Sequence, residues 1–466
     1  MHKFKAVVVI FVMVLLVGAL TTTASCVSPF WPKPPPGIRP IVFVHGGSGS
    51  AQQFESQAMR FTSNGYPPQY LRAFEYDSSF TVEDMNRVVE RLDEMINIVL
   101  AETGADKVDL IGHSLGTRVS LNYLSTADRR AKIAHYINID GSSGSYAPEG
   151  VPTLGIWSAP GRELIGAVKN IWIPGQFHTE VCTSSESFVE MFKFLTGEEP
   201  PTKDIIPEPP GHVWISGRVV IFPLNIFIGY PMPDSPAILE IWEVDSSTGY
   251  RIYDEPNATF EIRAPDGKWG PFKAKAGAYY EFCLLREGLS PHHHYREPFI
   301  RSNYWVTLLT SLPGGIADQI DRSDRHSALL IIKNREFIGD LEANNDILEI
   351  NGVNIITPKI FTRTKLVIGI WVYDNRSDGF SDLTKIVYPF HRYIFQTAVD
   401  LFIPAADPPD GIISLVLTPR YGGGRTQVIN VPNWASSKHR VTIQFNDYLQ
   451  DINSFQEYMR TWRPKH

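Results

Sequence analysis

Cysteine is scarce in this chain. Only Cys26, Cys182 and Cys283 occur among the 466 residues, so a scaffold held together by several disulfides is excluded. No C-x-x-C pair and no G-x-x-x-x-G-K-[ST] loop is present, which removes the common zinc-binding and nucleotide-binding motifs. We therefore predict neither a metal nor a cofactor.

An excess of positive charge is also lacking. The chain has 43 Lys and Arg against 50 Asp and Glu, a formal net charge of −7, and no basic block. Because proteins that bind nucleic acid need a basic surface, we expect no nucleic-acid partner. The composition, 43% hydrophobic and 12% aromatic, is that of a globular protein, and the length favours two or three domains. The sequence does not indicate an oligomeric state.

A long apolar run lies at the N-terminus. Residues 6–20 follow two lysines and precede a stretch of small residues that ends before Cys26. Since the run is shorter than the roughly 20 residues that span a bilayer, residues 1–25 predict a signal peptide. We then expect the protein to be secreted or anchored at the cell surface, with an uncleaved anchor as the alternative. Cys26 is a candidate for lipid attachment or for a disulfide with Cys182, and the sequence does not decide between them.

Proline-rich segments divide the rest of the chain. Residues 26–38 predict a stiff linker, and residues 198–211 contain five prolines and four acidic residues. We therefore expect one domain at residues 39–197 and a second region at residues 212–466.

Strand-like and helix-like segments alternate over residues 39–197. We expect strands at 41–44, 71–76, 108–111, 132–139, 153–157 and 169–173, and helices at 53–64, 81–103, 115–127 and 184–195. This alternation predicts an α/β fold in which a parallel sheet carries helices on both faces. Reactive groups in such a sheet gather at the carboxyl ends of the strands.

Residues 212–466 have a different sequence pattern. Short runs rich in β-branched and aromatic residues, separated by turn residues, predict an all-β sandwich or barrel, in one part or in two parts that meet near residue 290. Asn351-Gly352 predicts a hairpin, and Asp266-Gly267 is a second candidate. We interpret His292-His293-His294 as a solvated loop, because three successive residues cannot all face one ion. Residues 447–462 alone are expected to be helical.

The motif Gly112-His113-Ser114-Leu115-Gly116 follows an apolar strand and precedes a helix-compatible run. This G-x-S-x-G pattern is typical of a nucleophilic serine on a sharp turn, where glycines on both sides leave room. Backbone N–H groups at the start of the following helix face developing negative charge. We therefore predict Ser114 as the nucleophile and the Leu115 N–H as one oxyanion donor.

A nucleophilic serine needs a base, and the base needs an orienting acid. His178 follows a predicted strand and is our predicted base, whereas His135 lies inside a strand and is expected to be structural. Asp140 ends a predicted strand and is favoured as the acid over Glu163, which lies in a loop after the next strand. Asp109 lies inside a strand, away from the nucleophile, and is a poor candidate.

A second oxyanion donor is expected in the loop that follows the first strand. His45-Gly46-Gly47 comes directly after residues 41–44, and glycines there can present free backbone N–H groups. Gly47 is the predicted second donor.

Residues 39 to about 197 resemble α/β-hydrolase lipases, most closely thermophilic archaeal lipases with a β-rich C-terminal lipid-binding domain. The resemblance rests on Val42-Phe-Val-His-Gly46, on residues 108–116, on Phe74-Glu-Tyr-Asp77 and on Ile139-Asp-Gly141. It implies a triad of Ser114, Asp140 and His178, with Gly47 and Leu115 at the oxyanion and a β-rich region that helps to bind acyl chains. The family's helical lid, inserted after Asp77, has no counterpart here, so shorter or more soluble esters are also expected as substrates.

Together these features predict an exported serine hydrolase that cleaves carboxylic esters, above all those of lipids. The expected partner is a lipid or ester substrate, and association with a membrane or lipid surface is consistent with it. Two alternatives stay open: a cell-surface protein that binds glycan or lipid with a vestigial hydrolase domain, and a peptidase or acyltransferase that uses the same triad.

Overall fold

The computed structural model describes residues 37–227 and 236–450. The predicted signal peptide, most of the linker at 26–38, Cys26 and most of the predicted C-terminal helix lie outside the described residues. Within the described ranges, no helix is long and apolar enough to cross a bilayer.

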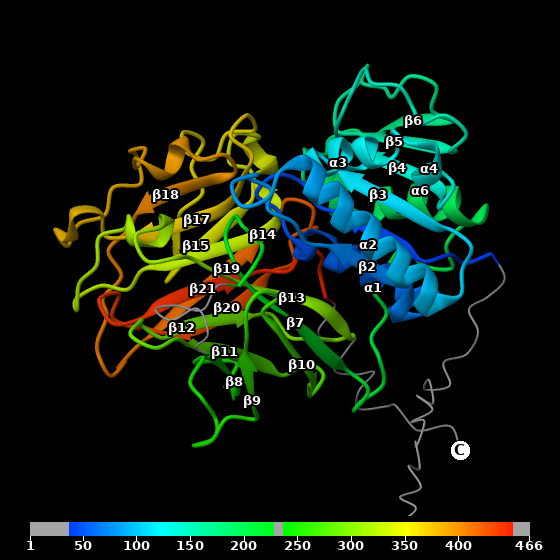
Figure 1. Ribbon diagram of the computed structural model, residues 1–466. Coiled ribbons are helices and arrows are strands. Elements are labelled where there is room, and N and C mark those ends of the chain that lie inside the picture. The colour runs from blue at the N-terminus through cyan, green and yellow to red at the C-terminus, as the bar shows by residue number, and fades with distance from the viewer. Residues whose placement is uncertain (1–36, 228–235, 451–466) are drawn as a thin grey trace, which may run out of the picture. The chain divides into compact units, whose positions relative to one another are not determined.

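A six-stranded parallel sheet forms the first part of the molecule (Figure 1). Its order is β2-β1-β3-β4-β5-β6, and each strand pairs in parallel with its neighbours. The strands are β1 (Ile41–Val44), β2 (Leu71–Phe74), β3 (Val108–His113), β4 (Ile133–Ile139), β5 (Thr153–Trp157) and β6 (Lys169–Trp172). β1 and β3 are buried along their whole length, as their continuous apolar runs predict. The predicted parallel sheet is confirmed.

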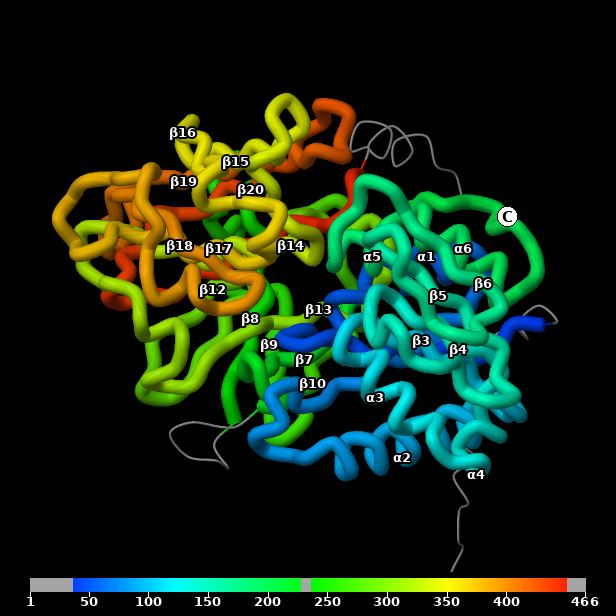
Figure 2. The backbone as a smooth tube through the Cα atoms, turned by 90° about the horizontal axis from the view of Figure 1, so that it is seen from above, coloured from blue at the N-terminus to red at the C-terminus, as the bar shows by residue number. Residues whose placement is uncertain are grey.

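Helices cover both faces of this sheet, as Figure 2 shows. They are α1 (Glu55–Ser63), α2 (Met85–Thr103), α3 (Leu115–Tyr123), α4 (Ala127–Arg130), α5 (Glu180–Thr183) and α6 (Ser185–Thr196). α2 and α3 pack in one apolar cluster, and α1 and α6 pack in another. α2 buries most of its predicted stripe and ends at left-handed Gly104, and at its N-terminus the Arg87 N–H donates to the capping Asp84 side chain.

Three β-sheets form the region after residue 211. The three-stranded sheet joins β10 (Lys268–Lys273), β7 (Trp214–Ile221) and β13 (Asn303–Thr310). The four-stranded sheet joins β16 (Val353–Asn354), β15 (Ile347–Ile350), β19 (Ile412–Thr418) and β20 (Gln427–Pro432). The eight-stranded sheet has the order β18 (Gln396–Asp400), β17 (Val367–Tyr373), β14 (Leu329–Phe337), β21 (Arg440–Gln444), β12 (His292–Arg296), β11 (Tyr279–Leu285), β8 (Ala237–Val244) and β9 (Ala258–Ile262).

The eight-stranded sheet packs against both smaller sheets. One apolar cluster joins its β14, β17 and β21 to β15, β19 and β20, and another joins its β8, β9 and β11 to β7 and β13. Sheet-on-sheet packing of this kind confirms the predicted mostly β architecture. Strands from both sides of residue 290 share the large sheet. Short 3-10 turns occur at Ala51–Phe54, Pro68–Tyr70, Ile316–Asp318, Glu342–Asn344, Asn375–Ser377 and Phe390–Arg392.

Two local predictions in this region were wrong, and one is confirmed. His292-His293-His294 is no solvated loop but the first part of buried strand β12, where successive side chains face opposite sides. His293 bonds Glu281 through Nδ1 at 2.6 Å, which satisfies its polar ring inside the sheet. Asp266-Gly267 links β9 and β10, which belong to different sheets. Asn351-Gly352 does close the β15–β16 hairpin, with positive φ at both residues.

Candidate active site

Ser114 lies on a sharp turn between β3 and α3. Its backbone has φ 51° and ψ −120°, a conformation that costs about 1–3 kcal/mol in a residue other than glycine. A Cβ at Gly116 would lie 2.2 Å from the Val44 carbonyl oxygen, and one at Gly112 would lie 2.8 Å from the Gly116 carbonyl oxygen. Both flanking positions therefore require glycine, because neighbouring backbone leaves no space for a side chain.

The structure brings three of the predicted site residues together. His178 Nε2 lies 2.9 Å from Ser114 Oγ, and His178 Nδ1 lies 2.6 Å from Asp140 Oδ2. Ser114 follows β3, Asp140 follows β4, and His178 lies in the loop between β6 and α5. Glu163 bonds Gly144 through its backbone carbonyl, and its side chain makes no hydrogen bond to His178. Asp140 is therefore the carboxylate at the imidazole.

Asp140 is held as an anion. Its side chain accepts hydrogen bonds from the Ser158 N–H at 3.0 Å, the Ser158 hydroxyl at 2.8 Å and Arg162 Nη1 at 2.8 Å. Burial alone would raise the pKa of Asp140, but the hydrogen bonds from His178 and Ser158 outweigh it and lower the pKa to about 2. An ionised Asp140 fixes the proton of His178 on Nδ1 and leaves Nε2 free to accept the serine proton.

The histidine within the serine motif has a positioning role that the sequence analysis missed. His113 is buried, its Nδ1 lies 2.7 Å from Gln53 Nε2, and its Nε2 lies 2.8 Å from the His178 carbonyl oxygen. Burial and the neighbouring His178 lower the pKa of His113 to about 3, so the ring is neutral at pH 7. Because Gln53 Oε1 accepts the Gly46 N–H at 3.1 Å, the same amide also holds the glycine loop.

Gly47 and Leu115 lie next to each other beside the serine. A Cβ at Gly47 would lie 3.6 Å from Leu115 Cδ2. Among the hydrogen bonds of the described residues, none is donated by either N–H. Two free backbone donors beside the nucleophile match the requirement for stabilising an oxyanion.

A residue of the β region braces this glycine loop. The Asn225 side-chain amide donates to the Gly49 carbonyl oxygen at 2.7 Å and to Glu75 Oε2 at 2.7 Å, and it lies 3.0 Å from His45 Nε2. Asn225 is itself buried. The loop that contains Gly47 is therefore fixed from both regions of the chain.

The β region also holds the segment that contains the imidazole. Glu336, buried in β14, accepts the Thr179 N–H at 2.5 Å and the Glu180 N–H at 3.1 Å, directly after His178. Phe395 lies parallel to the His178 ring, with 5.9 Å between centroids and 10° between planes. No sequence motif indicates these contacts, because Glu336 is 157 residues from Thr179.

One cluster in the β region has metal-ligating side chains. Suitable atoms of Glu281, Cys283 and His293 lie within 4.8 Å of one another. Arg251 donates to both oxygens of Glu281, at 2.9 and 2.8 Å, and so occupies the carboxylate with a positive charge. Cys283 and Cys182 are both buried free thiols.

Models of known protein families match three stretches of this chain. Residues 38–135 match the model described as lipase (class 2), and residues 211–313 match the lipase C-terminal domain. Residues 315–449 match a further model of a C-terminal domain. The first stretch includes Gly47, Ser114 and Leu115.

A comparison with solved structures gives matches of low identity and low TM-score. A CIB-like hydrolase from Thermoplasma acidophilum is 15% identical over 35% of this chain and 89% of its own, with a TM-score of 0.27. A lipase from Bacillus licheniformis in propeptide form is 11% identical over 86% of this chain and 94% of its own, with a TM-score of 0.28. The phospholipase PlaB from Legionella pneumophila, in complex with thio-NAD, is 10% identical over 88% and 93%, with a TM-score of 0.22.

Proposed function

We propose that this lipase-like protein, an α/β-hydrolase with a C-terminal β-rich region, cleaves the carboxylic ester bonds of lipids through Ser114, His178 and Asp140. The observation that carries the proposal is one imidazole with both ring nitrogens engaged, Nε2 by the serine hydroxyl at 2.9 Å and Nδ1 by the carboxylate at 2.6 Å.

The geometry supports an acyl-enzyme mechanism. His178 Nε2 accepts the hydroxyl proton as Ser114 Oγ attacks the ester carbonyl, and ionised Asp140 stabilises the imidazolium that results. The N–H groups of Gly47 and Leu115 stabilise the oxyanion of the tetrahedral intermediate. The imidazolium then gives its proton to the leaving alcohol, and a water molecule repeats the sequence to release the acid and free Ser114.

A cavity of the β region supports a lipid substrate. It has a cavity volume of about 90 Å³ and opens to solvent, and both Ser48 of the glycine loop and Phe395 beside His178 belong to its wall. We call it the β-region cavity. Its wall is mostly apolar, which favours a hydrocarbon chain over a polar ligand. We assign the acyl chain of the ester to this cavity, which Ser114 does not itself line but which reaches Ser48 and Phe395.

A labelling experiment tests the site. A fluorophosphonate probe should label the unmutated protein at one serine, and Ser114→Ala should lose both this label and p-nitrophenyl ester hydrolysis by about a thousandfold or more. The exposed Ser125→Ala is the matched control and should keep full activity. Turnover retained in Ser114→Ala would exclude the site.

The remaining alternatives give different results in the same assays. An unlabelled protein that binds liposomes or polysaccharide would indicate a binding protein with a vestigial hydrolase domain. A panel of esters, amides and acceptor alcohols separates a lipase from a peptidase or an acyltransferase.

We also propose that the protein is exported and is secreted or surface-anchored, on the basis of the signal-like residues 1–25. The mass of the mature protein tests this, because cleavage after residue 25 removes a defined N-terminal segment and a lipid on Cys26 adds to the mass.

A further inference from the structure

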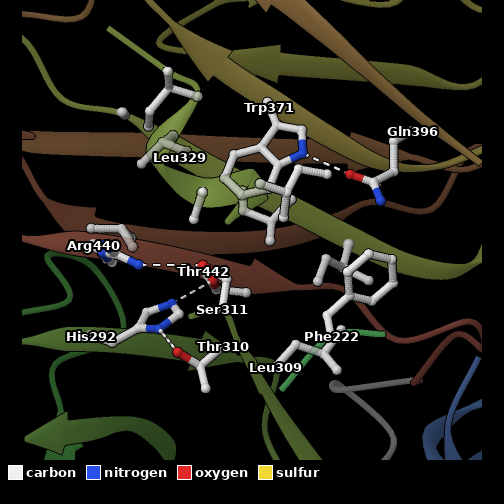
Figure 3. Close-up of a pocket in the computed structure, with 18 of the residues that line it drawn as sticks. Phe222, His292, Leu309, Thr310, Ser311, Leu329, Trp371, Gln396, Arg440 and Thr442 are labelled. Atoms are coloured by element: carbon white, nitrogen blue, oxygen red, sulfur yellow. Dashed lines mark hydrogen bonds between the residues drawn. The ribbon is translucent and has the colours of Figure 1, made fainter. Parts of the chain in front are cut away.

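The β-region cavity has two chemically different sides, as Figure 3 shows. Phe222, Leu309 and Trp371 are part of an extensive apolar wall. His292 lies on the other side, where its ring is 2.8 Å from Thr442 Oγ1 and 3.4 Å from Thr310 Oγ1. Burial holds the pKa of His292 well below its usual range, so this imidazole adds no charge to the cavity.

Three arginines make the polar side of the cavity positive. Arg322 and Arg440 line it, and Arg286 lies beside them with only 5% of its surface exposed. We call these three residues the arginine cluster. Burial, together with the charge of Arg440, lowers the pKa of both Arg286 and Arg322 to about 10, which leaves both cationic at pH 7.

The arginine cluster is short of negative charge. In the described part of the chain, the only carboxylate that pairs with any of the three is Asp318, which lies 2.5 Å from Arg440. Arg322 donates instead to the carbonyl oxygens of Ala317 and Ser436. Nε and Nη2 of Arg286 are buried and have no hydrogen-bond partner among the described residues. Unpaired buried charges are costly, and an anion bound in the cavity at Arg322 and Arg440 would relieve this cost.

We propose that the β-region cavity binds a long-chain carboxylate, with its head at the arginine cluster and its tail along the apolar wall toward Phe395. A guanidinium matches a carboxylate with paired N–H donors, which favours a carboxylate head over an uncharged one. The apolar wall favours a hydrocarbon tail, because each CH₂ group that leaves water for an apolar surface adds to the affinity.

This site goes beyond ester hydrolysis and does not depend on it, since binding requires no turnover. If the proposed hydrolysis also holds, its fatty-acid product can bind in the cavity that takes the acyl chain of the substrate, but in the opposite orientation, with the carboxylate at the arginine cluster and not at Ser114. The product then inhibits cleavage of long-chain esters and leaves that of acetate esters almost unchanged, because an acetyl group does not reach into the cavity.

Calorimetry on the full chain tests the site by the chemistry of the head group. Dodecanoate, kept below its critical micelle concentration, should bind saturably and at least tenfold more tightly than dodecanol, which has the same tail. Acetate, which has the head alone, should show no saturable binding in the same range. These comparisons use the unmutated protein, so they stand even if a cavity variant fails to fold.

A variant then locates the head group. Arg440→Gln should weaken dodecanoate binding at least tenfold and change dodecanol binding less than twofold, while Arg363→Gln, an exposed arginine of the same region, should change neither. Equal affinity for dodecanoate and dodecanol, no saturable binding, or a dodecanoate affinity that Arg440→Gln leaves unchanged would overturn the proposal. Loss of ester hydrolysis in Ser114→Ala with normal dodecanoate binding keeps the two proposals separate.

Discussion

The two regions of the molecule contribute to the site in different ways. The α/β region supplies the three side chains of the proposed triad, each from the carboxyl end of a strand or the loop that follows it. The β region supplies contacts that hold them: Glu336 on the backbone after His178, Phe395 on its ring and Asn225 on the glycine loop. Reactive groups are therefore concentrated in one region, whereas their positioning is shared between both. Substitutions in the α/β region and in the β region test this difference, because they should change activity by different amounts.

The largest loss of activity should come from substitution of Asp140, the acid of the proposed triad. Asp140→Asn should lower kcat by about a thousandfold to ten-thousandfold, because the amide neither fixes the Nδ1 proton nor stabilises the imidazolium. Glu163→Gln, the matched control at the other candidate acid, should stay within about twofold. The reverse ranking in steady-state p-nitrophenyl ester kinetics would move the acid to Glu163.

The next largest loss of activity should come from substitution of Glu336 in the β region. Glu336→Gln should lower kcat about tenfold and Glu336→Ala about a hundredfold, since a small displacement of the imidazole is enough for such losses. KM should change little, because Glu336 binds the backbone of Thr179 and Glu180 and not the substrate. The exposed Glu342→Gln is the control.

Active-site titration distinguishes positioning from a general loss of folded protein, because unfolded protein also lowers the apparent kcat and leaves KM unchanged. If kcat per active site, titrated with a fluorophosphonate, equals that of the unmutated protein in both Glu336 variants, the division between the two regions fails.

A smaller and selective effect is expected at Phe395. Phe395→Ala should raise KM for p-nitrophenyl dodecanoate about tenfold and change acetate hydrolysis by less than threefold, because Phe395 lines the β-region cavity as well as facing His178. Phe380→Ala, at a side chain that is 76% exposed in the same region, serves as control. An equal loss on both esters would make Phe395 a positioning residue for His178 alone.

The smallest effect concerns stability in acid. The pKa of Asp140 is about 2 in the folded chain, below its ordinary value of 3.8, so its ionised form stabilises the fold above about pH 4. This contribution, roughly 2 kcal/mol, should be lost as the pH falls from 4 through 2. Denaturant unfolding of Asp140→Asn should lack this part of the pH dependence. A slope identical to that of the unmutated protein would show that the folded pKa of Asp140 is not lowered.

Local patterns were enough to predict the α/β region. Apolar runs such as Ile41–Val44 and the stripe of α2 indicate buried strands and helices, and a parallel sheet brings its strand ends to one edge. Asp140 and His178 could be selected on this basis. Ser158 and Arg162 follow β5 at the same edge and could have been found by the same rule.

The contacts of the β region could not be predicted in this way. Glu336 is a polar residue inside a strand. Its hydrogen-bond partners lie in a backbone segment 157 positions away, and no local sequence pattern predicts a contact over that distance. The prediction of a solvated loop at the histidines of β12 was wrong for a related reason. Three polar residues in succession suggest a loop, but cross-strand partners such as Glu281 allow them to be buried.

The position of Glu336 in the chain has a consequence for synthesis. Ribosomes make Ser114, Asp140 and His178 well before β14, so a growing chain contains the whole proposed triad before it contains the carboxylate that holds the histidine segment. If the proposed function holds, full activity is expected only once β14 has been made and has packed against the segment that follows His178.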